Sequence, residues 1–293
     1  MITLSHDLSK LLIIGNSFFD VIAELDTEEN GLNQRAVLET RLGGVFNISR
    51  KLNFYQIPHE VHTIIGLPLS RESSLKYLSE FDAKVVNLKN VNVSDDYMCL
   101  ASILINRKSS ERTSFVRPGV SQKVCITKEI VGESRFIHIS YLDYLSSIDP
   151  ELLMELNQSG IFVSADLCIN DYTEQERTRV QGLLKALSLL FISDSEYEAL
   201  FQTSASLHNI AKNIMLPKGT VVHFPNKLLI REGDQVLKVT GVKYPKVTTL
   251  GFGDNFVAYF YINYLKEKKI IEALTESFYA CQYDAKEDSG SQL

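Results

Sequence analysis

The residues best suited to chemistry lie near the C-terminus, in the segment Gly251-Phe252-Gly253-Asp254. Glycines let backbone N–H groups approach a ligand closely. The apolar residues 256–265 that follow predict a helix, whose positive end and free N–H groups would form an anion site at the same point. If the anion is a phosphoryl group in transfer, Asp254 can accept the proton of the attacking hydroxyl. The alternative is a helix-capping aspartate after a glycine-rich turn.

Two segments near the N-terminus could bind a polyhydroxyl ligand. Gly43 and Gly44 precede Asn47 at a predicted helix start, where backbone and an amide can surround hydroxyl groups. A tight turn before a helix explains the same pattern. Asp20 follows the first predicted strand, 11–14, and ligands of open α/β sheets bind at the carboxyl ends of strands. Asp20 is therefore a candidate for binding sugar hydroxyls, and the alternative is a solvent-exposed turn aspartate.

Short apolar runs alternate with amphipathic segments along the chain. The predicted strands are 11–14, 61–65, 136–139, 161–163, 189–192 and 220–223. The clearest amphipathic segments are 73–81, 149–158 and 174–187. This alternation is typical of parallel strands in βαβ units. It predicts an α/β fold with a doubly wound, mostly parallel sheet in a three-layer α/β/α architecture.

Two segments interrupt this alternation. Residues 21–25 continue out of the first strand, and residues 97–115 read as a hairpin around the polar turn 107–112. Such inserted strands are expected to form a small separate β-sheet, which in an enzyme would be a lid. An edge extension of the main sheet is the alternative.

The expected organisation is one domain over residues 1–293. The lid strands would lie at about 20–42 and 97–118, and the polar residues 284–293 are expected to form a frayed tail. An exposed lid edge could pair with a second copy of the chain, which would give a homodimer.

The composition is that of a globular protein, with 45% hydrophobic and 23% charged residues. The net charge is −6 and the basic residues are scattered, which argues against a nucleic-acid partner. Four cysteines without a CxxC pair fit free thiols in a reducing compartment. No signal peptide is readable, and the longest apolar stretch, 257–265, is far shorter than the ~20 residues that span a bilayer. We therefore expect a cytoplasmic protein without a membrane partner.

Other reaction classes lack their motifs. The sequence contains no GxxxxGK[ST] loop, no GxSxG elbow and no HExxH zinc motif. Gly15 is the only glycine after the first strand, which argues against a dinucleotide-binding fingerprint.

Taken together, the three candidate segments resemble the ribokinase (PfkB) family of carbohydrate and nucleoside kinases. In that family an aspartate ends the first strand, a glycine pair followed by an asparagine comes next, and a Gly-x-Gly-Asp segment lies near the C-terminus. The resemblance runs from about Leu11 to Ala280 and includes blander stretches at 109–119, 136–145 and 161–170. It implies a ribokinase-like fold with a lid, ATP as the phosphoryl donor, Mg²⁺, and a sugar- or nucleoside-like acceptor.

The resemblance also implies a role for each site residue. The residues that would contact the acceptor are Asp20, Gly43, Gly44 and Asn47. The backbone of Gly251, Phe252 and Gly253 would form the anion hole, and Asp254 would be the general base. Because Asp20 and Asn47 suit any vicinal diol, the identity of the acceptor stays open.

The departures from the family pattern lie on the nucleotide side. The metal-linked Asn-x-x-Glu motif reads Ser193-Asp194-Ser195-Glu196, so Glu196 would still bind Mg²⁺ indirectly through water, while Ser193 replaces the amide. The glycine-rich turn expected near residue 225 reads 223–227 without glycine, and Phe252 replaces a small residue. Two hypotheses follow: a carbohydrate kinase with an unusual donor site, or a catalytically inactive protein that binds a ligand or acts as a scaffold.

Overall fold

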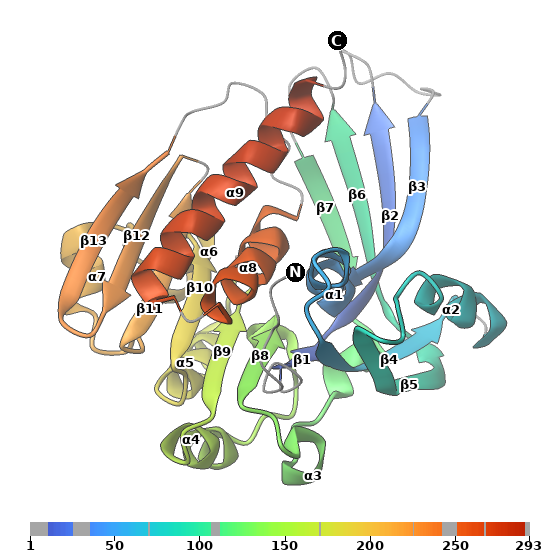
Figure 1. Cartoon of the computed structure of the whole chain (residues 1–293), viewed down its shortest axis with the longest axis horizontal. Coiled ribbons are helices and arrows are strands. Elements are labelled where there is room, and N and C mark those ends of the chain that lie inside the picture. The colour runs from blue at the N-terminus through green and yellow to red at the C-terminus, as the bar shows by residue number, and fades with distance from the viewer. Residues whose placement is uncertain are drawn as a thin grey trace.

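The computed structural model describes residues 11–25, 36–69, 71–106, 112–169, 171–224, 226–241, 251–266 and 268–290. Within them the main sheet has nine strands in the order β13-β12-β11-β10-β9-β8-β1-β4-β5 (Figure 1). Their bounds are β1 Leu11–Gly15, β4 His59–Leu67, β5 Val86–Tyr97, β8 Phe136–Ser140, β9 Phe162–Asp166, β10 Leu189–Ser193, β11 Gly219–Phe224, β12 Lys227–Glu232 and β13 Gln235–Thr240. In this order, all neighbours from β11 across β1 to β5 pair in parallel, and β12 and β13 add antiparallel next to β11. The predicted mostly parallel sheet is confirmed.

Helices cover both faces of this sheet, which gives the predicted three layers. Along β1, Leu11 and Ile13 belong to the apolar core on one face, and Leu12 and Ile14 to the core on the other. The helices on the first face are α1 Val45–Phe54, α2 Arg71–Leu78, α8 Phe252–Tyr264 and α9 Ile270–Gly290. Those on the other face are α3 Lys128–Val131, α4 Pro150–Gln158, α5 Glu174–Leu184, α6 Asp194–Phe201 and α7 Leu207–Lys212.

The order in which the chain adds strands to the sheet reverses at β1, near the centre of the sheet. From β1 the chain adds β4 and β5 on one side, and then β8 to β11 on the other. In open α/β sheets the ligand site lies outside the carboxyl ends of the strands at such a switch point. The carboxyl ends of β1 and β8 are therefore where a site is expected.

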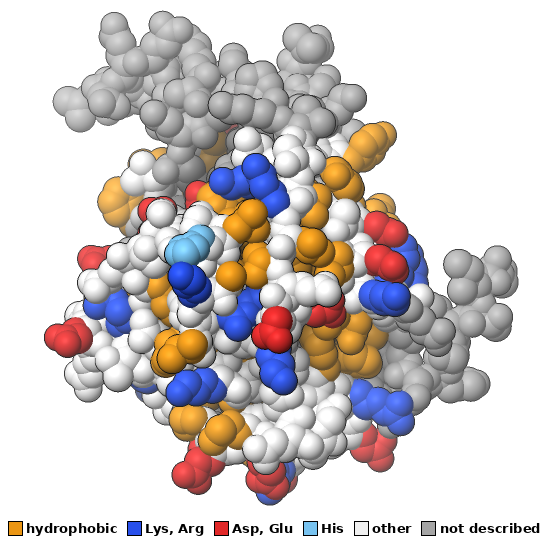
Figure 2. All heavy atoms as spheres, turned by 90° about the vertical axis from the view of Figure 1, so that its left-hand side faces the viewer, with side chains coloured by type: hydrophobic (Ala, Val, Ile, Leu, Met, Phe, Trp, Pro, Cys, Tyr) orange, Lys and Arg blue, Asp and Glu red, His pale blue; other side chains and the backbone are white. Residues whose placement is uncertain are grey.

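Each of the six predicted strands corresponds to a strand of this sheet, whereas β5, β12 and β13 were not predicted. Most residues of β5 and β13 are partly or fully exposed. Both lie at sheet edges, where a strand packs against little and its sequence stays polar. On the face shown in Figure 2, which includes the β13 edge, acidic and basic side chains are interspersed and form no basic stripe among the residues drawn in colour.

A second sheet stands beside the main one (Figure 1). Its order is β3-β2-β6-β7, with β2 Ser17–Leu25, β3 Ala36–Gly44, β6 Cys99–Asn106 and β7 Arg112–Arg117. The inserted segments therefore form a small separate sheet, as predicted, and not an edge extension of the main sheet. One of its faces carries an apolar cluster that contains Phe18, Ile22 and Ile103 and packs against Tyr141 and Tyr144. Its function as a lid stays a prediction.

The C-terminal end differs from the expectation of a frayed tail from residue 284. Helix α9 continues to Gly290, while residues 291–293 lie outside the described residues. The Asp284 carboxylate accepts hydrogen bonds from Lys51 Nζ at 2.6 Å and from the Tyr259 hydroxyl at 2.8 Å. These bonds attach Asp284 to α1 and α8, and polarity alone did not reveal them. No helix among the described residues is long and apolar enough to cross a membrane.

Candidate active site

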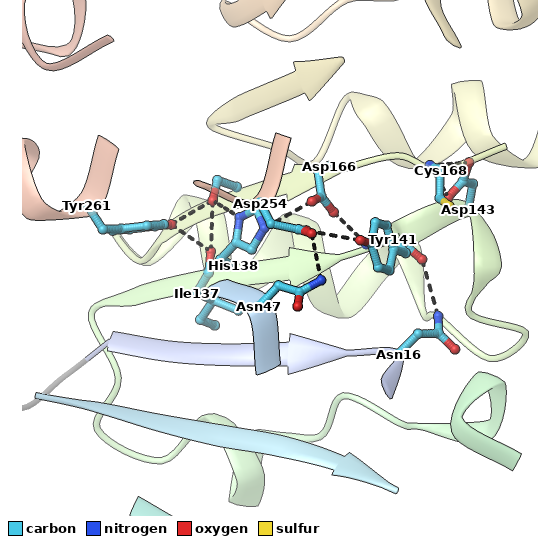
Figure 3. A network of polar contacts seen from close by, with 11 residues as sticks. Asn16, Asn47, Ile137, His138, Tyr141, Asp143, Asp166, Cys168, Asp254 and Tyr261 are labelled. Carbon is cyan, nitrogen blue, oxygen red and sulfur yellow. Dashed lines mark hydrogen bonds and ion pairs between the residues drawn. The ribbon is translucent and has the colours of Figure 1, made fainter. Parts of the chain in front are cut away.

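Asp254 lies in the first turn of α8, after Gly251 at the helix N-cap with a φ of 72°. Its side chain does not cap the helix. Instead, one carboxylate oxygen accepts a hydrogen bond from Asn47 Nδ2 at 2.9 Å, and the other accepts one from the Tyr141 hydroxyl at 3.0 Å (Figure 3). The N-cap interpretation of Asp254 is therefore wrong, because its carboxylate is directed towards α1 and the end of β8.

Burial changes the acidity of Asp254. Loss of hydration raises the pKa of its carboxyl group from 3.8 to about 7, and the negative charge of Asp166 adds to the increase. The hydrogen bonds from Asn47 and Tyr141 act in the opposite direction. A carboxyl group with a pKa near neutrality exchanges a proton readily under ordinary conditions, as a general base must.

Asn47 is fixed by its neighbours on α1. Its amide oxygen accepts a hydrogen bond from Arg50 Nη1 at 3.2 Å, so that its nitrogen points at Asp254. The helix begins after Gly44, whose φ is 65° and where a Cβ atom would lie 2.2 Å from the backbone oxygen of Asn16. Only glycine fits this close approach. Gly44 therefore determines where α1 begins and, with it, the position of Asn47.

Asp20 lies in β2 and not in an exposed turn, so that alternative is wrong. Its side chain is buried against Gly43, where a Cβ atom would lie 2.2 Å from an Asp20 carboxylate oxygen. Arg41 Nε lies 3.7 Å from the same oxygen. Burial raises the pKa of Asp20 to about 6, although the positive charge of Arg41 lowers it. The predicted contact of Asp20 with sugar hydroxyls stays untested.

A cavity of about 320 Å³ lies beside Asp254. It is lined by Tyr141, Asp166, Leu167, Cys168, Phe191, Ser193, Asp194, Ser195, Glu196, His223, Gly251, Phe252, Gly253 and Asp254. The structure thus brings the predicted base, the predicted anion hole and the predicted metal-linked motif together around one space. Asp20, Gly43, Gly44 and Asn47 are not among the residues that line it.

A second cavity, of about 350 Å³, lies on the other side of the Gly251 turn. Its lining includes Asn47 and three basic residues, Arg41, Arg50 and Lys51. Each of these cations also has a carboxylate within 4.0 Å. Gly251 lines both cavities, so the start of α8 separates a cavity rich in carboxylates from one rich in cations.

Glu196 and Ser193 form a capping box at the start of α6. The Ser193 hydroxyl accepts a hydrogen bond from the Glu196 backbone N–H at 3.2 Å, and the Glu196 carboxylate accepts one from the Ser193 backbone N–H at 2.7 Å. Burial raises the pKa of Glu196 to about 8, and Asp143 and Asp166 add to the increase. Glu196 therefore has a structural role in addition to its place on the cavity wall.

Three residues that the sequence did not single out also line the cavity: Tyr141, Asp166 and His223. Tyr141 directly follows β8 and Asp166 ends β9, so both lie at the carboxyl edge where ligand-binding residues gather. Their position after predicted strands was the available signal. Burial lowers the pKa of His223 to about 4, which keeps its ring neutral beside Phe252, with 5.8 Å between the ring centroids.

A buried polar chain lies behind Asp166. His138 Nδ1 and the Ser164 hydroxyl are 2.8 Å apart, and the Ser164 and Tyr261 hydroxyls are 2.6 Å apart (Figure 3). His138 Nε2 lies 3.8 Å from an Asp166 carboxylate oxygen and has no hydrogen-bond partner among the described residues. Among the described residues, His138 therefore has a hydrogen-bond partner at only one of its two ring nitrogens.

No family model matches the sequence, and no curated protein does either. Solved structures are similar in fold. An adenosine kinase from Sinorhizobium meliloti is 16% identical, with a TM-score of 0.73 over 94% of this chain and 93% of that one. A nucleoside kinase from Burkholderia thailandensis in complex with inosine is 16% identical, with a TM-score of 0.70 over 92% and 89%.

The ribokinase of Arabidopsis thaliana in complex with ribose and ATP is also 16% identical, with a TM-score of 0.69 over 93% of this chain and 91% of that one. At such identities the likeness concerns the fold. The chain has the ribokinase-type α/β fold that these carbohydrate and nucleoside kinases share.

Proposed function

We propose that this protein transfers the γ-phosphoryl group of ATP to a hydroxyl of a small sugar- or nucleoside-like acceptor. The observation that carries the proposal is the buried Asp254 carboxylate, which lies directly after the Gly251–Gly253 turn on the wall of the 320 Å³ cavity. Its pKa of about 7 allows it to take a proton from an acceptor hydroxyl near neutral pH. Fold neighbours that bind ATP, ribose or inosine support the substrate class.

In this mechanism the protein positions and stabilises the reacting groups. Free N–H groups at the start of α8 stabilise the negative charge of the phosphoryl group in transfer. Asp254 accepts the proton of the acceptor hydroxyl while that oxygen attacks the γ-phosphorus and ADP leaves. Asn47 fixes the orientation of the Asp254 carboxylate through its 2.9 Å hydrogen bond. Closure of the small sheet would exclude water from the reaction.

The charge of the cavity favours a requirement for Mg²⁺. Its described lining contains four carboxyl groups, Asp166, Asp194, Glu196 and Asp254, and no lysine or arginine. The lining therefore offers no basic side chain to balance the charge of a nucleotide triphosphate, and a cation would have to come with it. Mg²⁺ prefers oxygen ligands and keeps several waters, so Asp166 and Glu196 fit an ion held through water. No cluster of three metal-ligating side chains is found among the described residues. When bound, Mg²⁺ would neutralise phosphate charge.

Calorimetry and a substrate panel test the proposal. Titration with ATP and Mg²⁺ should give saturable binding at or below millimolar nucleotide. A coupled assay for ADP should then identify at least one sugar or nucleoside as acceptor. If ATP with Mg²⁺ does not bind at millimolar concentration, the kinase proposal fails.

The second candidate function is a non-catalytic ligand-binding or scaffold protein of the same fold. Its support is the donor side, where the Glu196 carboxylate caps its own helix and the rings of His223 and Phe252 occupy the cavity wall. Binding of ribose or inosine without any ADP release in the same panel would favour this candidate.

A further inference from the structure

Tyr141 is held in an unusual position between Asp166, Phe18 and Asp254. Its backbone has a φ of 58°, in the left-handed region that non-glycine residues rarely adopt. The Tyr141 backbone N–H donates a hydrogen bond to Asp166 Oδ1 at 2.5 Å, and its ring packs edge-on against Phe18 with 5.4 Å between centroids. Strained backbone persists only where its surroundings enforce it, and such positions cluster at functional sites.

The hydroxyl at the end of this ring already makes the contact that an acceptor needs. A general base must accept a hydrogen bond from the hydroxyl that it deprotonates. The Tyr141 phenol donates such a bond to Asp254 Oδ1 at 3.0 Å, while Asn47 uses Oδ2. Tyr141 also lines the cavity in which the predicted anion hole lies. The phenol therefore stands where an acceptor hydroxyl would meet the base.

We propose that Tyr141 controls acceptor binding by occupying the hydroxyl position on Asp254, so that a productive ligand must displace its phenol. This inference rests on the proposed function, because it assigns Asp254 Oδ1 as the contact for the acceptor. Without an acceptor, the phenol also keeps water from the base. With an acceptor, the ligand hydroxyl takes over the hydrogen bond and the phenol moves away from Asp254.

The strength of the phenol–carboxylate bond sets the expected effect. A ligand that displaces the phenol must first break a hydrogen bond to a buried, ionisable group. Such bonds contribute enough free energy to change a dissociation constant by about tenfold or more. Removing only the hydroxyl therefore makes the position available at no cost to the ligand, while the ring remains to fill its space against Phe18.

Calorimetry with ribose and with inosine, each with and without ADP and Mg²⁺, compares the wild type with Tyr141→Phe. We expect Tyr141→Phe to bind at least one ligand about tenfold more tightly. Tyr144→Phe is the matched control, because Tyr144 packs on the same Phe18 ring at 5.9 Å and is not a described hydrogen-bond donor to Asp254. Its affinity should equal that of the wild type. In wild type with ¹³C-labelled tyrosine rings, the Tyr141 signal, assigned from its loss in Tyr141→Phe, should shift when ligand binds.

Equal or weaker binding by Tyr141→Phe would overturn the inference, because the phenol would then assist the ligand or have no contact with its position. Failure of both ligands to bind Tyr141→Phe would also overturn it. The kinase proposal is judged separately, by ADP release. Tighter binding without ADP release in either protein would support the role of Tyr141 and end the kinase proposal.

Discussion

The two sides of Asp254 use their polar groups differently. On the predicted acceptor side, the groups bind one another: Asn47 and Tyr141 donate to Asp254, and Asp20 lies against Gly43. On the predicted donor side, Glu196 lines an open cavity of about 320 Å³. The matching residues Asn47 and Asp20 are thus held against their neighbours, whereas Ser193 and Phe252, which depart from the family pattern, border the cavity of about 320 Å³.

This difference separates two kinds of information. The residues that agree with the motif are those whose side chains have a fixed geometry, as in the hydrogen-bond network around Asp254. Ser193 and Phe252, where the sequence departs from the pattern, line a cavity of about 320 Å³. The departures on the donor side therefore leave room for a ligand. Mutations that act on one side only can test whether the two sides have separate roles.

The largest effect is expected for Asp254→Asn. Asparagine keeps the shape and can still accept a hydrogen bond, but it cannot take a proton from the acceptor. Removal of a general base typically lowers the rate by about 10² to 10⁴, so kcat should fall by that order while nucleotide binding persists. The measurements are coupled ADP release and calorimetry.

Asp149→Asn is the matched control for this change. Asp149 is the N-cap of α4, where asparagine serves nearly as well, so turnover should stay at the wild-type level. Wild-type kcat in Asp254→Asn would show that Asp254 is not the base.

The pH dependence of stability gives the next effect. Folding raises the pKa of Asp254 from 3.8 to about 7, so its protonated form is favoured in the folded state. The associated stability is fully present below about pH 4 and is lost as the pH rises through about 7. The Asp254→Asn protein has no carboxyl group at this position, so it does not lose this stability as the pH rises. Relative to wild type it should gain up to about 4 kcal/mol between pH 4 and pH 8, because one pKa unit corresponds to about 1.4 kcal/mol.

Urea unfolding at pH 4, 6 and 8 measures this difference. The raised pKa values of Asp20 and Glu196 act with the same sign, but they are present in both proteins and largely cancel in the comparison. A stability difference that stays constant over this pH range would mean that Asp254 does not titrate near 7.

Gly43→Ala disturbs the acceptor side alone. The new Cβ atom would lie 2.2 Å from an Asp20 oxygen, so β3 and Asp20 must move apart. Overpacking of this kind costs about 1–3 kcal/mol. Gly182→Ala in α5 is the control, because a Cβ atom there meets nothing within 4 Å and should stabilise the helix by about 0.5–1 kcal/mol. Thermal unfolding should move in opposite directions for the two variants; a stable Gly43→Ala protein would argue that Asp20 is mobile.

The smallest effect is expected for Glu196→Gln on the donor side. Glutamine can accept the same hydrogen bond from the Ser193 backbone, so the capping box at the start of α6 should be kept. If Glu196 orients water on Mg²⁺, turnover should fall several-fold and half-maximal rate should need more Mg²⁺, with acceptor affinity unchanged. Glu176→Gln is the control, since Glu176 forms the same capping box with Thr173 on α5, away from the cavity. Identical magnesium titrations for both variants would restrict Glu196 to a structural role.

Much of the fold could be predicted, because buried parallel strands leave continuous apolar runs such as 189–192 in the sequence. The separate small sheet could also be predicted from alternation that does not fit βαβ units. Strands β5 and β13 could not, since edge strands carry polar residues that resemble loops. The hydrogen bonds of Asp284 in α9 with Lys51 and Tyr259 could not be predicted either, because they are tertiary contacts.

The site was predictable where backbone geometry demands a particular residue. Gly43, Gly44 and Gly251 lie at close approaches or in left-handed backbone, and a glycine in the sequence indicates that either is possible. Tyr141 adopts left-handed backbone without glycine, so its position directly after a predicted strand was the signal that the sequence offered. The Ser193–Glu196 capping box matches a Ser-x-x-Glu pattern in the sequence, so the same four residues fit both a helix start and the metal-linked motif.

The hydrogen bond between Asn47 and Asp254 joins residues 207 positions apart. The apolar core around it likewise combines Val45 and Phe46 of α1 with Phe256 and Phe260 of α8. A ribosome adding about 5–20 residues per second needs about 10 to 40 s to cover that separation. During this interval α1 has been made but its partner helix has not. The speed of translation therefore sets how long the apolar face of α1 remains without its partner α8.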